Sequence, residues 1–251
     1  MMDADQIASS MADLWEYLLP WAPGLRMVRK GGAYAMVNDL PSPVNGVYFE
    51  RRDPDPGAVT ALLDEVAAAG LPYTLSVRPG DAGAFAQLAI ERGLAWADDL
   101  PLMLLETAAA RRPAPVPGFG VRELAPAEVA RHVAVAVAGF GFPAEAFEQI
   151  ANPDLLAVDG YRCYLGELNG EPVATGISVT FGPLTGLFSI ATVPGRRGRG
   201  FGTAITARAI SDAGRAGSAW CWLQSSPDGH PIYEGLGFRT VETWPTWQSP
   251  E

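Results

Sequence analysis

Cysteine and histidine are scarce in this sequence of 251 residues. It has two cysteines, Cys163 and Cys221, and two histidines, His132 and His230. Both cysteines lie in apolar, strand-like runs, which favours reduced core side chains over a disulfide or a catalytic thiol. These few residues are scattered and form no metal-ligand cluster, so no metal is predicted.

Positive charge is also in the minority. The chain has 18 Lys and Arg residues against 28 Asp and Glu residues, a net charge of −10 at pH 7. Nucleic acid is therefore not an expected partner, because phosphate contacts need Lys and Arg. The same negative field would attract a small cationic molecule.

Long apolar runs are absent as well. No run is long enough to span a bilayer, and the acidic start at residues 1–5 lacks the apolar part of a signal peptide. We therefore expect no membrane association and a reduced, cytoplasmic location. Apolar residues make up 48% of the chain and charged residues 18%, which favours a folded chain over a disordered one.

A proline-rich segment divides the sequence. Residues 111–118 read Arg-Arg-Pro-Ala-Pro-Val-Pro-Gly, and alternating prolines favour an extended spacer. We predict an N-terminal domain at 1–112, a linker at 113–118 and a C-terminal domain at 119–251.

The C-terminal half shows the clearer pattern of elements. Asn169-Gly170 is a two-residue hairpin signal between two alternating runs. The pattern predicts strands at 119–123, 161–168, 171–181, 184–193, 218–225 and 237–244, and helices at 126–138, 143–150, 199–216 and 229–235.

The N-terminal half has a weaker version of the same rhythm. The pattern predicts a first helix at 11–19, a strand at 47–49, a helix at 56–69, a strand at 73–77, a second helix capped by Asp81, and a strand ending at 102–105. The C-terminal half also has an arginine- and glycine-rich loop at residues 194–200, and the N-terminal half has no counterpart to it.

That loop is the most distinctive part of the chain. Residues 190–204 read as a buried strand, a basic glycine turn and a helix, which would aim backbone N–H groups and a helix N-terminus at one anion. A P-loop is excluded because Phe201 follows Gly200. A dinucleotide fingerprint fails because Thr203 stands where Gly or Ala is needed. A Gly-x-Ser-x-Gly elbow is absent too, so a serine hydrolase is unsupported.

Arg197, Gly200 and Gly202 match the pattern Arg/Gln-x-x-Gly-x-Gly/Ala. With the strand before it and the Tyr-x-x-x-Gly-Phe segment after it, this loop resembles the acyl-coenzyme A pyrophosphate loop of the GNAT acetyltransferases. The alternative is an ordinary strand-to-helix turn. The resemblance is specific over 119–244 and loose over the first half.

The resemblance implies an α/β fold (α+β, with a mixed sheet) of two GNAT-like lobes, each a mostly antiparallel sheet flanked by helices. The first lobe would be a degenerate copy without a cofactor motif, or else an unrelated α/β domain.

The resemblance also implies acetyl-coenzyme A (acetyl-CoA) as co-substrate, without a metal. Backbone groups of one strand would pair with its pantetheine arm, and the loop amides would hold its pyrophosphate. Ser226 stands where many members have Asn and would contact the arm. The implied cofactor residues are Ile190, Ala191, Thr192, Arg197, Gly198, Arg199, Gly200, Phe201, Gly202, Thr203 and Ser226.

Catalytic roles follow from the same resemblance. Tyr233 lies at the general-acid position, and the Thr192 backbone N–H is the expected oxyanion donor. Local packing is the alternative role for Tyr233. Glu145 or Glu148 is the candidate general base, and His230 could line the site.

We therefore predict an N-acetyltransferase that moves the acetyl group of acetyl-CoA to a primary amine, such as a small cation, by direct attack in a ternary complex. A non-catalytic acyl-CoA sensor and an enzyme acting on a protein N-terminus or lysine are the alternatives. The acyl chain length and a homodimer stay open.

Overall fold

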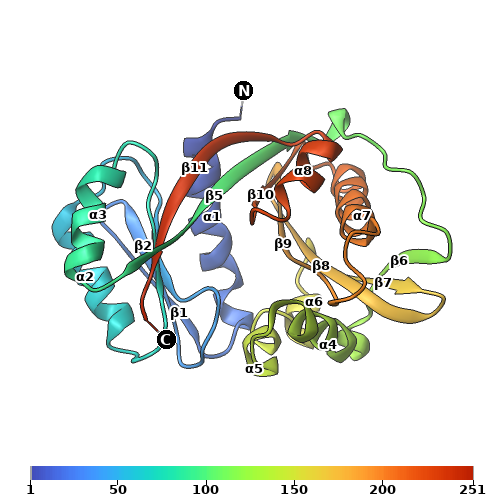
Figure 1. Cartoon of the computed structure of the whole chain (residues 1–251), viewed down its shortest axis with the longest axis horizontal. Coiled ribbons are helices and arrows are strands. Elements are labelled where there is room, and N and C mark those ends of the chain that lie inside the picture. Colours follow the sequence, from blue (N-terminus) through green and yellow to red (C-terminus); the bar gives the residue numbers. More distant parts are fainter. Residues whose placement is uncertain (1, 251) are drawn as a thin grey trace. The chain divides into compact units, whose positions relative to one another are not determined.

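The computed structural model describes residues 2–250, and the chain divides into two compact units. Unit 1 combines the residues up to Leu102 with those from Thr240 onward, and unit 2 is Met103–Arg239. Two strands, β5 (Ala95–Glu106) and β11 (Arg239–Gln248), carry the chain from one unit into the other (Figure 1).

Unit 1 is built on a sheet that the end of the chain completes. The β1–β2, β2–β3 and β4–β11 pairs are antiparallel, and the β3–β4 pair is parallel. In chain order its elements are α1 (Ala4–Leu18), η1 (Leu19–Trp21), β1 (Leu25–Lys30), β2 (Ala33–Asn38), β3 (Gly46–Phe49), α2 (Pro56–Ala67), β4 (Thr74–Ser76), α3 (Ala82–Glu91), the first part of β5 and nearly all of β11.

Unit 2 has a sheet with antiparallel β6–β7, β7–β8 and β8–β9 pairs and a parallel β9–β10 pair. Its elements after β5 are η2 (Thr107–Ala109), β6 (Phe119–Glu123), η3 (Pro126–Glu128), α4 (Val129–Phe140), α5 (Ala144–Glu148), α6 (Pro153–Leu156), β7 (Tyr161–Leu168), β8 (Glu171–Phe181), β9 (Leu184–Thr192), α7 (Phe201–Arg215), β10 (Trp220–Gln224) and α8 (His230–Leu236). The predicted mixed α/β class and the mostly antiparallel sheets are confirmed.

The compact units do not coincide with the domains expected from the proline-rich segment. That segment, 113–118, lies inside unit 2, and β11 belongs mostly to unit 1 because it pairs with β4, Trp247 lying opposite Leu75. The division into 1–112 and 119–251 stays a prediction about domains.

Helices α4 and α7 cover opposite faces of the sheet in unit 2. A Cβ added to Gly176 of β8 would lie 2.7 Å from the Ile205 Cγ2 of α7, whereas its neighbour Thr175 bonds His132 of α4. Successive residues of a strand point to opposite faces, so the two helices sandwich β8 and its neighbours.

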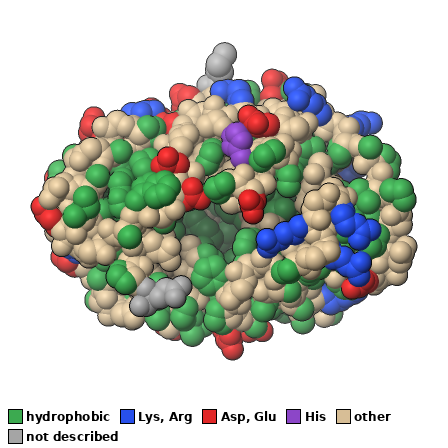
Figure 2. Space-filling view, in the orientation of Figure 1, with side chains coloured by type: hydrophobic (Ala, Val, Ile, Leu, Met, Phe, Trp, Pro, Cys, Tyr) green, Lys and Arg blue, Asp and Glu red, His purple; other side chains and the backbone are tan. Residues whose placement is uncertain are grey.

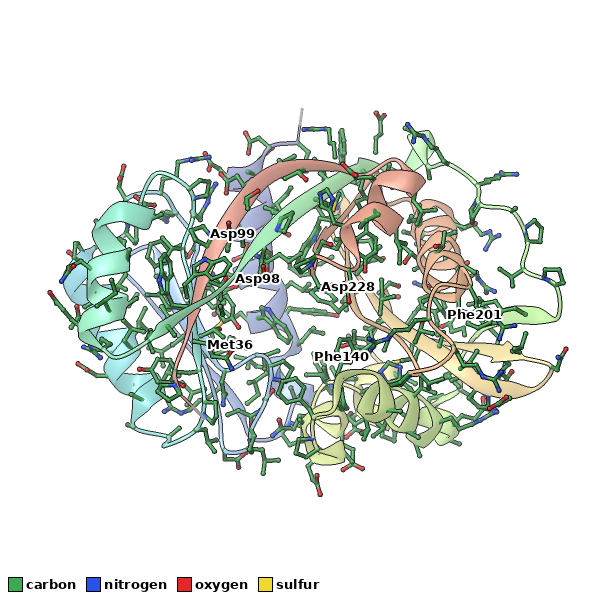
Figure 3. All side chains as sticks on the ribbon, in the orientation of Figure 1. Met36, Asp98, Asp99, Phe140, Phe201 and Asp228 are labelled. Carbon is green, nitrogen blue, oxygen red and sulfur yellow. The ribbon has the colours of Figure 1, made fainter. Side chains whose placement is uncertain are left out.

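The core of each unit is mostly apolar. Met36 of unit 1 and Phe201 of unit 2 are fully buried, while Phe140 at the end of α4 is 47% exposed (Figure 3). Both cysteines are free and buried, as predicted. On the visible face, charged and hydrophobic side chains are intermixed (Figure 2). No helix within residues 2–250 combines the length and apolar character needed to cross a membrane.

Two helix N-termini in unit 1 differ in part from the sequence prediction. Helix α1 begins earlier than predicted, whereas α3 begins directly after Asp81 as predicted but lacks a side-chain cap. Helix α1 begins at Ala4 instead of residue 11, because the Asp3 carboxylate accepts the Gln6 N–H at 2.9 Å and the Gln6 side chain accepts the Asp3 N–H at 3.1 Å. Asp81 precedes α3, but its side chain does not cap that helix. It accepts the Asp53 N–H at 3.3 Å instead.

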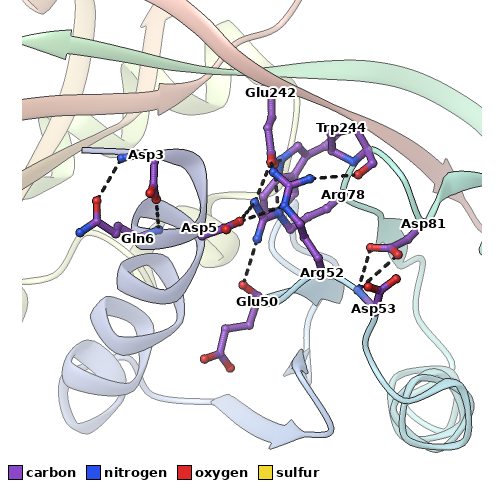
Figure 4. Close-up of polar contacts among 11 residues, drawn as sticks. Asp3, Asp5, Gln6, Glu50, Arg52, Asp53, Arg78, Asp81, Glu242 and Trp244 are labelled. Carbon is purple, nitrogen blue, oxygen red and sulfur yellow. Dashed lines mark hydrogen bonds and ion pairs between the residues drawn. The ribbon is translucent and has the colours of Figure 1, made fainter. Parts of the chain in front are cut away.

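A buried ion-pair network secures β11 within unit 1 (Figure 4). Arg78, which is fully buried, donates to both Glu242 oxygens at 3.0 and 2.6 Å and to Asp5 at 2.5 Å. Glu242 also accepts bonds from Arg52 and, at 2.8 Å, from the Trp244 indole. The network thus joins α1, the segment after β4, and β11.

Candidate acyl-coenzyme A site

Two parallel strands of unit 2 separate part-way along their length. β9 and β10 pair from Leu184 with Trp220 to Gly186 with Trp222. β9 continues to Thr192 and β10 to Gln224 without further pairing in the described ladder. The last part of β9 therefore has one strand edge free toward β10.

A β-bulge lies in this part of β9. Ala191 pairs with Thr175, but Phe188 pairs with Ile177, so β9 has one more residue than β8 over this stretch. Ser189 takes up the extra length with a φ of +49°, a left-handed conformation that is uncommon outside glycine.

The bond pattern shows which backbone groups face the free edge. The Val193 N–H donates to the Val173 oxygen on the β8 side at 3.0 Å. Because successive N–H groups point to opposite strand edges, the N–H groups of Thr192 and Ile190 point toward the free edge. Ala191, opposite Thr175, directs its backbone groups to β8. Of the three strand residues predicted to meet the pantetheine arm, two have backbone N–H groups that point toward the free edge.

The arginine- and glycine-rich loop between β9 and α7, residues 193–200, leads directly to a helix N-terminus. Gly195, Gly198 and Gly200 have φ of +78°, +73° and +82°, and Gly200, the N-cap of α7, supplies no side-chain cap. The N–H groups in the first turn of a helix have no acceptor within it, so they can bind an anion. A Cβ added to Gly202 would lie 3.8 Å from the Thr192 Oγ1, so the helix start adjoins the free edge.

The arginine side chains of the loop are partly engaged already. Arg197 donates to the Gly139 oxygen at 2.8 Å and to the Thr192 oxygen at 3.4 Å, which ties the last turn of α4 to the end of β9. Arg196 pairs with Glu171 at 2.8 Å. The Arg199 guanidinium lies 5.2 Å from the Phe201 ring centre. The predicted contact of Arg197 with a cofactor would therefore come from its backbone.

Tyr233 lies in α8 with its ring buried. It is 9% exposed, and its ring packs edge-on against Phe238 with centres 5.9 Å apart. Burial raises the pKa of the Tyr233 phenol to about 12. The hydroxyl is therefore protonated at neutral pH, as a general acid must be.

The family comparison agrees with this geometry. The model of the Acetyltransferase (GNAT) family matches residues 131–238, which lie inside unit 2. These residues form a GNAT domain. The sequence search gives no match among curated proteins.

Solved structures share the fold of the chain. A GCN5-related N-acetyltransferase from Kribbella flavida is 22% identical with a TM-score of 0.70, over 100% of this chain and 97% of that one. One from Sphaerobacter thermophilus is 16% identical with a TM-score of 0.60, over 96% and 89%. A tandem GNAT protein from the clavulanic acid biosynthesis pathway is 18% identical with a TM-score of 0.58, over 93% and 87%. Family and fold together support an acyl-CoA-dependent N-acetyltransferase in general terms.

Ser226 precedes α8 in the GNAT domain. Its hydroxyl accepts the Gly229 N–H at 3.3 Å, and its side chain is exposed. A Cβ on Gly229 would lie 2.9 Å from the Tyr233 Cε2, so this turn sits directly against the tyrosine ring. Asp228 lies in the same turn and is exposed (Figure 3). The predicted contact of Ser226 with the pantetheine arm stays a prediction.

The candidate bases are not brought next to Tyr233. Glu145 and Glu148 are exposed on the short helix α5, which lies at the opposite end of unit 2 from α8 (Figure 1). His230 begins α8, and its Nδ1 lies 3.6 Å from the Glu234 Oε2. The described residues contain no group of three or more His, Cys, Asp or Glu side chains placed to hold a metal ion.

Sequence analysis did not find the polar contact between α4 and β8. His132 is fully buried on α4, and its Nδ1 lies 2.5 Å from the Thr175 Oγ1, which also donates to the Tyr164 oxygen at 2.8 Å. Thr175 is the residue opposite Ala191. The sequence shows only a histidine in an Ala/Val-rich helix, and its partner is 43 residues away.

We expect this histidine to make stability depend on pH. Burial lowers the His132 pKa from 6.5 to about 4, so the unfolded chain binds its proton first as the pH falls. The free energy of unfolding should then decrease between pH 6.5 and 4 by about 1.4 kcal/mol per pH unit at most. Urea titrations at several pH values should show a flatter profile for His132→Asn. The control, His230→Asn, makes the same substitution at the other histidine of the chain and shows how far the slope change is specific to His132. An unchanged slope in His132→Asn would contradict the assignment.

Proposed function

We propose that the GNAT domain transfers the acetyl group of acetyl-CoA to a primary amine by direct attack in a ternary complex. The observation that carries this proposal is the free edge of β9 adjoining the uncapped start of α7. Such an arrangement suits a ligand with an extended amide-bearing arm and a pyrophosphate. The net charge of −10 favours a small cationic acceptor.

We assign most of the groups that the reaction needs to residues of this domain. The amine nitrogen attacks the thioester carbonyl carbon, and the Thr192 N–H stabilises the resulting oxyanion. The carbon–sulfur bond then breaks, and the thiolate takes the Tyr233 hydroxyl proton. Glu145 or Glu148 is proposed to take the proton that the ammonium group must lose, through water because α5 is not next to α8.

A ligand-binding test with Gly200→Glu addresses the cofactor site. A side chain is strained at a φ of +82°, and a carboxylate there would repel a pyrophosphate. Acetyl-CoA at about 100 times its dissociation constant should stabilise the wild type by roughly 2.7 kcal/mol, and we expect Gly200→Glu to lose this stabilisation. Thermal unfolding with and without acetyl-CoA, CoA or succinyl-CoA measures the ligand-induced stabilisation of the wild type and of the variant.

The matched control is Gly217→Glu at the other end of α7. Gly217 has a φ of +84°, and an added Cβ would meet open space, so the strain is similar but the loop is untouched. This variant should keep its ligand-induced shift. If no acyl-CoA shifts the wild type, the loop is only a turn and the proposed function is wrong. Activity confined to acidic or neutral acceptors would contradict the cationic acceptor.

A non-catalytic acyl-CoA sensor is the second candidate. The position of Glu145 and Glu148 on α5, away from α8, favours it because no base is then at hand (Figure 1). Binding of acetyl-CoA with no acetylation across a panel of small amines and peptides would support this role.

A further inference from the structure

A buried amide nitrogen without a hydrogen-bond partner among the described residues lies at the end of β10, on the half-buried side chain of Gln224. Gln224 is the last residue of this strand, and its Nε2 is buried with no hydrogen-bond partner among the residues described. Buried amide donors are nearly always paired in folded proteins, since an unpaired one loses its bonds to water without replacement. A bound molecule could supply the missing acceptor.

The amide lies where β9 and β10 separate. The last paired residue of β10 is Trp222, two positions before Gln224. Cys221 and Leu223 belong to the core under α7, so Trp222 and Gln224 share the opposite face of the strand. Gln224 therefore extends past the paired part of β10, alongside the free edge of β9.

The neighbourhood of this amide is aromatic. The Trp222 ring packs edge-on against Phe188, with centres 5.3 Å apart, and Phe188 directly precedes the bulge at Ser189. A Cβ on Gly186 would lie 2.6 Å from the Phe188 ring and 2.8 Å from the Trp222 ring, so these rings fill the point of separation. Beside such apolar surfaces, a neutral acceptor is easier to accommodate than a charged one.

We propose that the Gln224 side-chain amide donates a hydrogen bond to a carbonyl oxygen of the acyl-CoA bound between β9 and β10. This inference rests on the proposed function, because it takes acyl-CoA as the ligand of the free edge of β9. Acyl-CoA carries neutral carbonyl oxygens in the amides of its pantetheine arm and in its thioester. An N–H donor suits either oxygen, and it does not suit an ammonium group.

The test is Gln224→Met, which keeps the length of the side chain and removes the donor. Calorimetric titration with acetyl-CoA and with CoA, which lacks the thioester, measures both affinities. We expect the variant to bind acetyl-CoA about fivefold more weakly than the wild type, as for the loss of one neutral hydrogen bond. Weaker binding of acetyl-CoA alone assigns the bond to the thioester carbonyl, and equal weakening of both ligands assigns it to the pantetheine arm.

Gln87→Met in α3 is the matched control. Its amide donates to Glu91 at 3.0 Å on the exposed surface of unit 1, so the same substitution should leave both affinities unchanged. The melting temperature of unliganded Gln224→Met should equal or exceed that of the wild type, because an unpaired buried donor is removed.

Two results would overturn the inference. One is wild-type affinity of Gln224→Met for both ligands; the other is a lower melting temperature of the unliganded variant, which would show that Gln224 has a partner within the protein. If the wild type itself binds neither ligand, the proposed function fails, which separates that failure from the failure of this inference.

Discussion

Tyr233→Phe is expected to lower the turnover number about 100-fold while leaving the dissociation constant of acetyl-CoA nearly unchanged. The variant keeps the ring that packs on Phe238 and removes only the hydroxyl that would protonate the thiolate. Turnover is measured as the rate at which free CoA thiol forms from acetyl-CoA in the presence of an amine that the wild type acetylates. Calorimetric titration measures binding.

Tyr164→Phe provides the matched control. Tyr164 is also buried in the GNAT domain, and its hydroxyl lies 3.2 Å from the Ser178 Oγ on the sheet, so its loss should affect stability and not turnover. Equal turnover for Tyr233→Phe and the wild type would remove the general-acid role and leave Tyr233 a packing role.

The pH profile provides a second readout for Tyr233. A phenol with a pKa of about 12 stays protonated throughout the neutral and mildly alkaline range. If turnover decreases as the pH rises toward 10, we assign that decrease to a group other than the Tyr233 phenol. Tyr233→Phe should keep that decrease at the same pH.

Arg78→Met is expected to destabilise the folded protein by about 3–5 kcal/mol, because it leaves the Glu242 carboxylate buried without its main partner. Arg78 is fully buried and makes two bonds to this carboxylate (Figure 4). Arg52 and the Trp244 indole remain as partners, but neither replaces the two-pronged contact. Urea unfolding gives the free-energy difference.

The control for Arg78→Met is Arg26→Met. Arg26 pairs with Glu65 at 2.5 Å on the exposed surface, where an ion pair contributes about 0–1 kcal/mol. The double variant Arg78→Met with Glu242→Met should recover part of the lost stability, since no buried charge is then left alone. Similar small losses for Arg78→Met and Arg26→Met would show that the network does not stabilise unit 1.

Local signals in the sequence were sufficient for most of unit 2. Asn169 and Gly170 have φ of +51° and +87°, as the predicted hairpin turn between β7 and β8 requires. The predicted helix at 199–216 is α7, which begins two residues later because the left-handed Gly200 is its N-cap. In these segments, a few neighbouring residues determine the structure.

Unit 1 was harder to predict because its strands lack a clear alternation. Every residue of β2 is buried, from Ala33 to Asn38, and several of them are small or polar. β1 carries three basic residues among six, and these three are its exposed residues. Neither strand was predicted. The glycines between them, Gly31 and Gly32, have positive φ values and mark the turn only once the strands are known.

Some features of the candidate site also follow from the local sequence, whereas others depend on long-range contacts. The Arg197, Gly200 and Gly202 pattern is local, and the sequence was enough to predict the loop. The directions of the Ile190 and Thr192 amides depend on pairing with β8, and the unpaired amide of Gln224 depends on the separation of two strands. Such features need contacts between residues far apart in the sequence.

The membership of β11 in unit 1 has a consequence for synthesis on the ribosome. A nascent chain emerges from its N-terminus, so the residues up to Leu102 are made first. Their sheet lacks the strand next to β4, and Arg78 lacks Glu242, until residues 240–248 have been added. Unit 2, made in one continuous stretch, has all its strands earlier. We therefore expect the usual order, in which N-terminal domains fold first, to be reversed in this chain, because the unit that is started first is the one completed last.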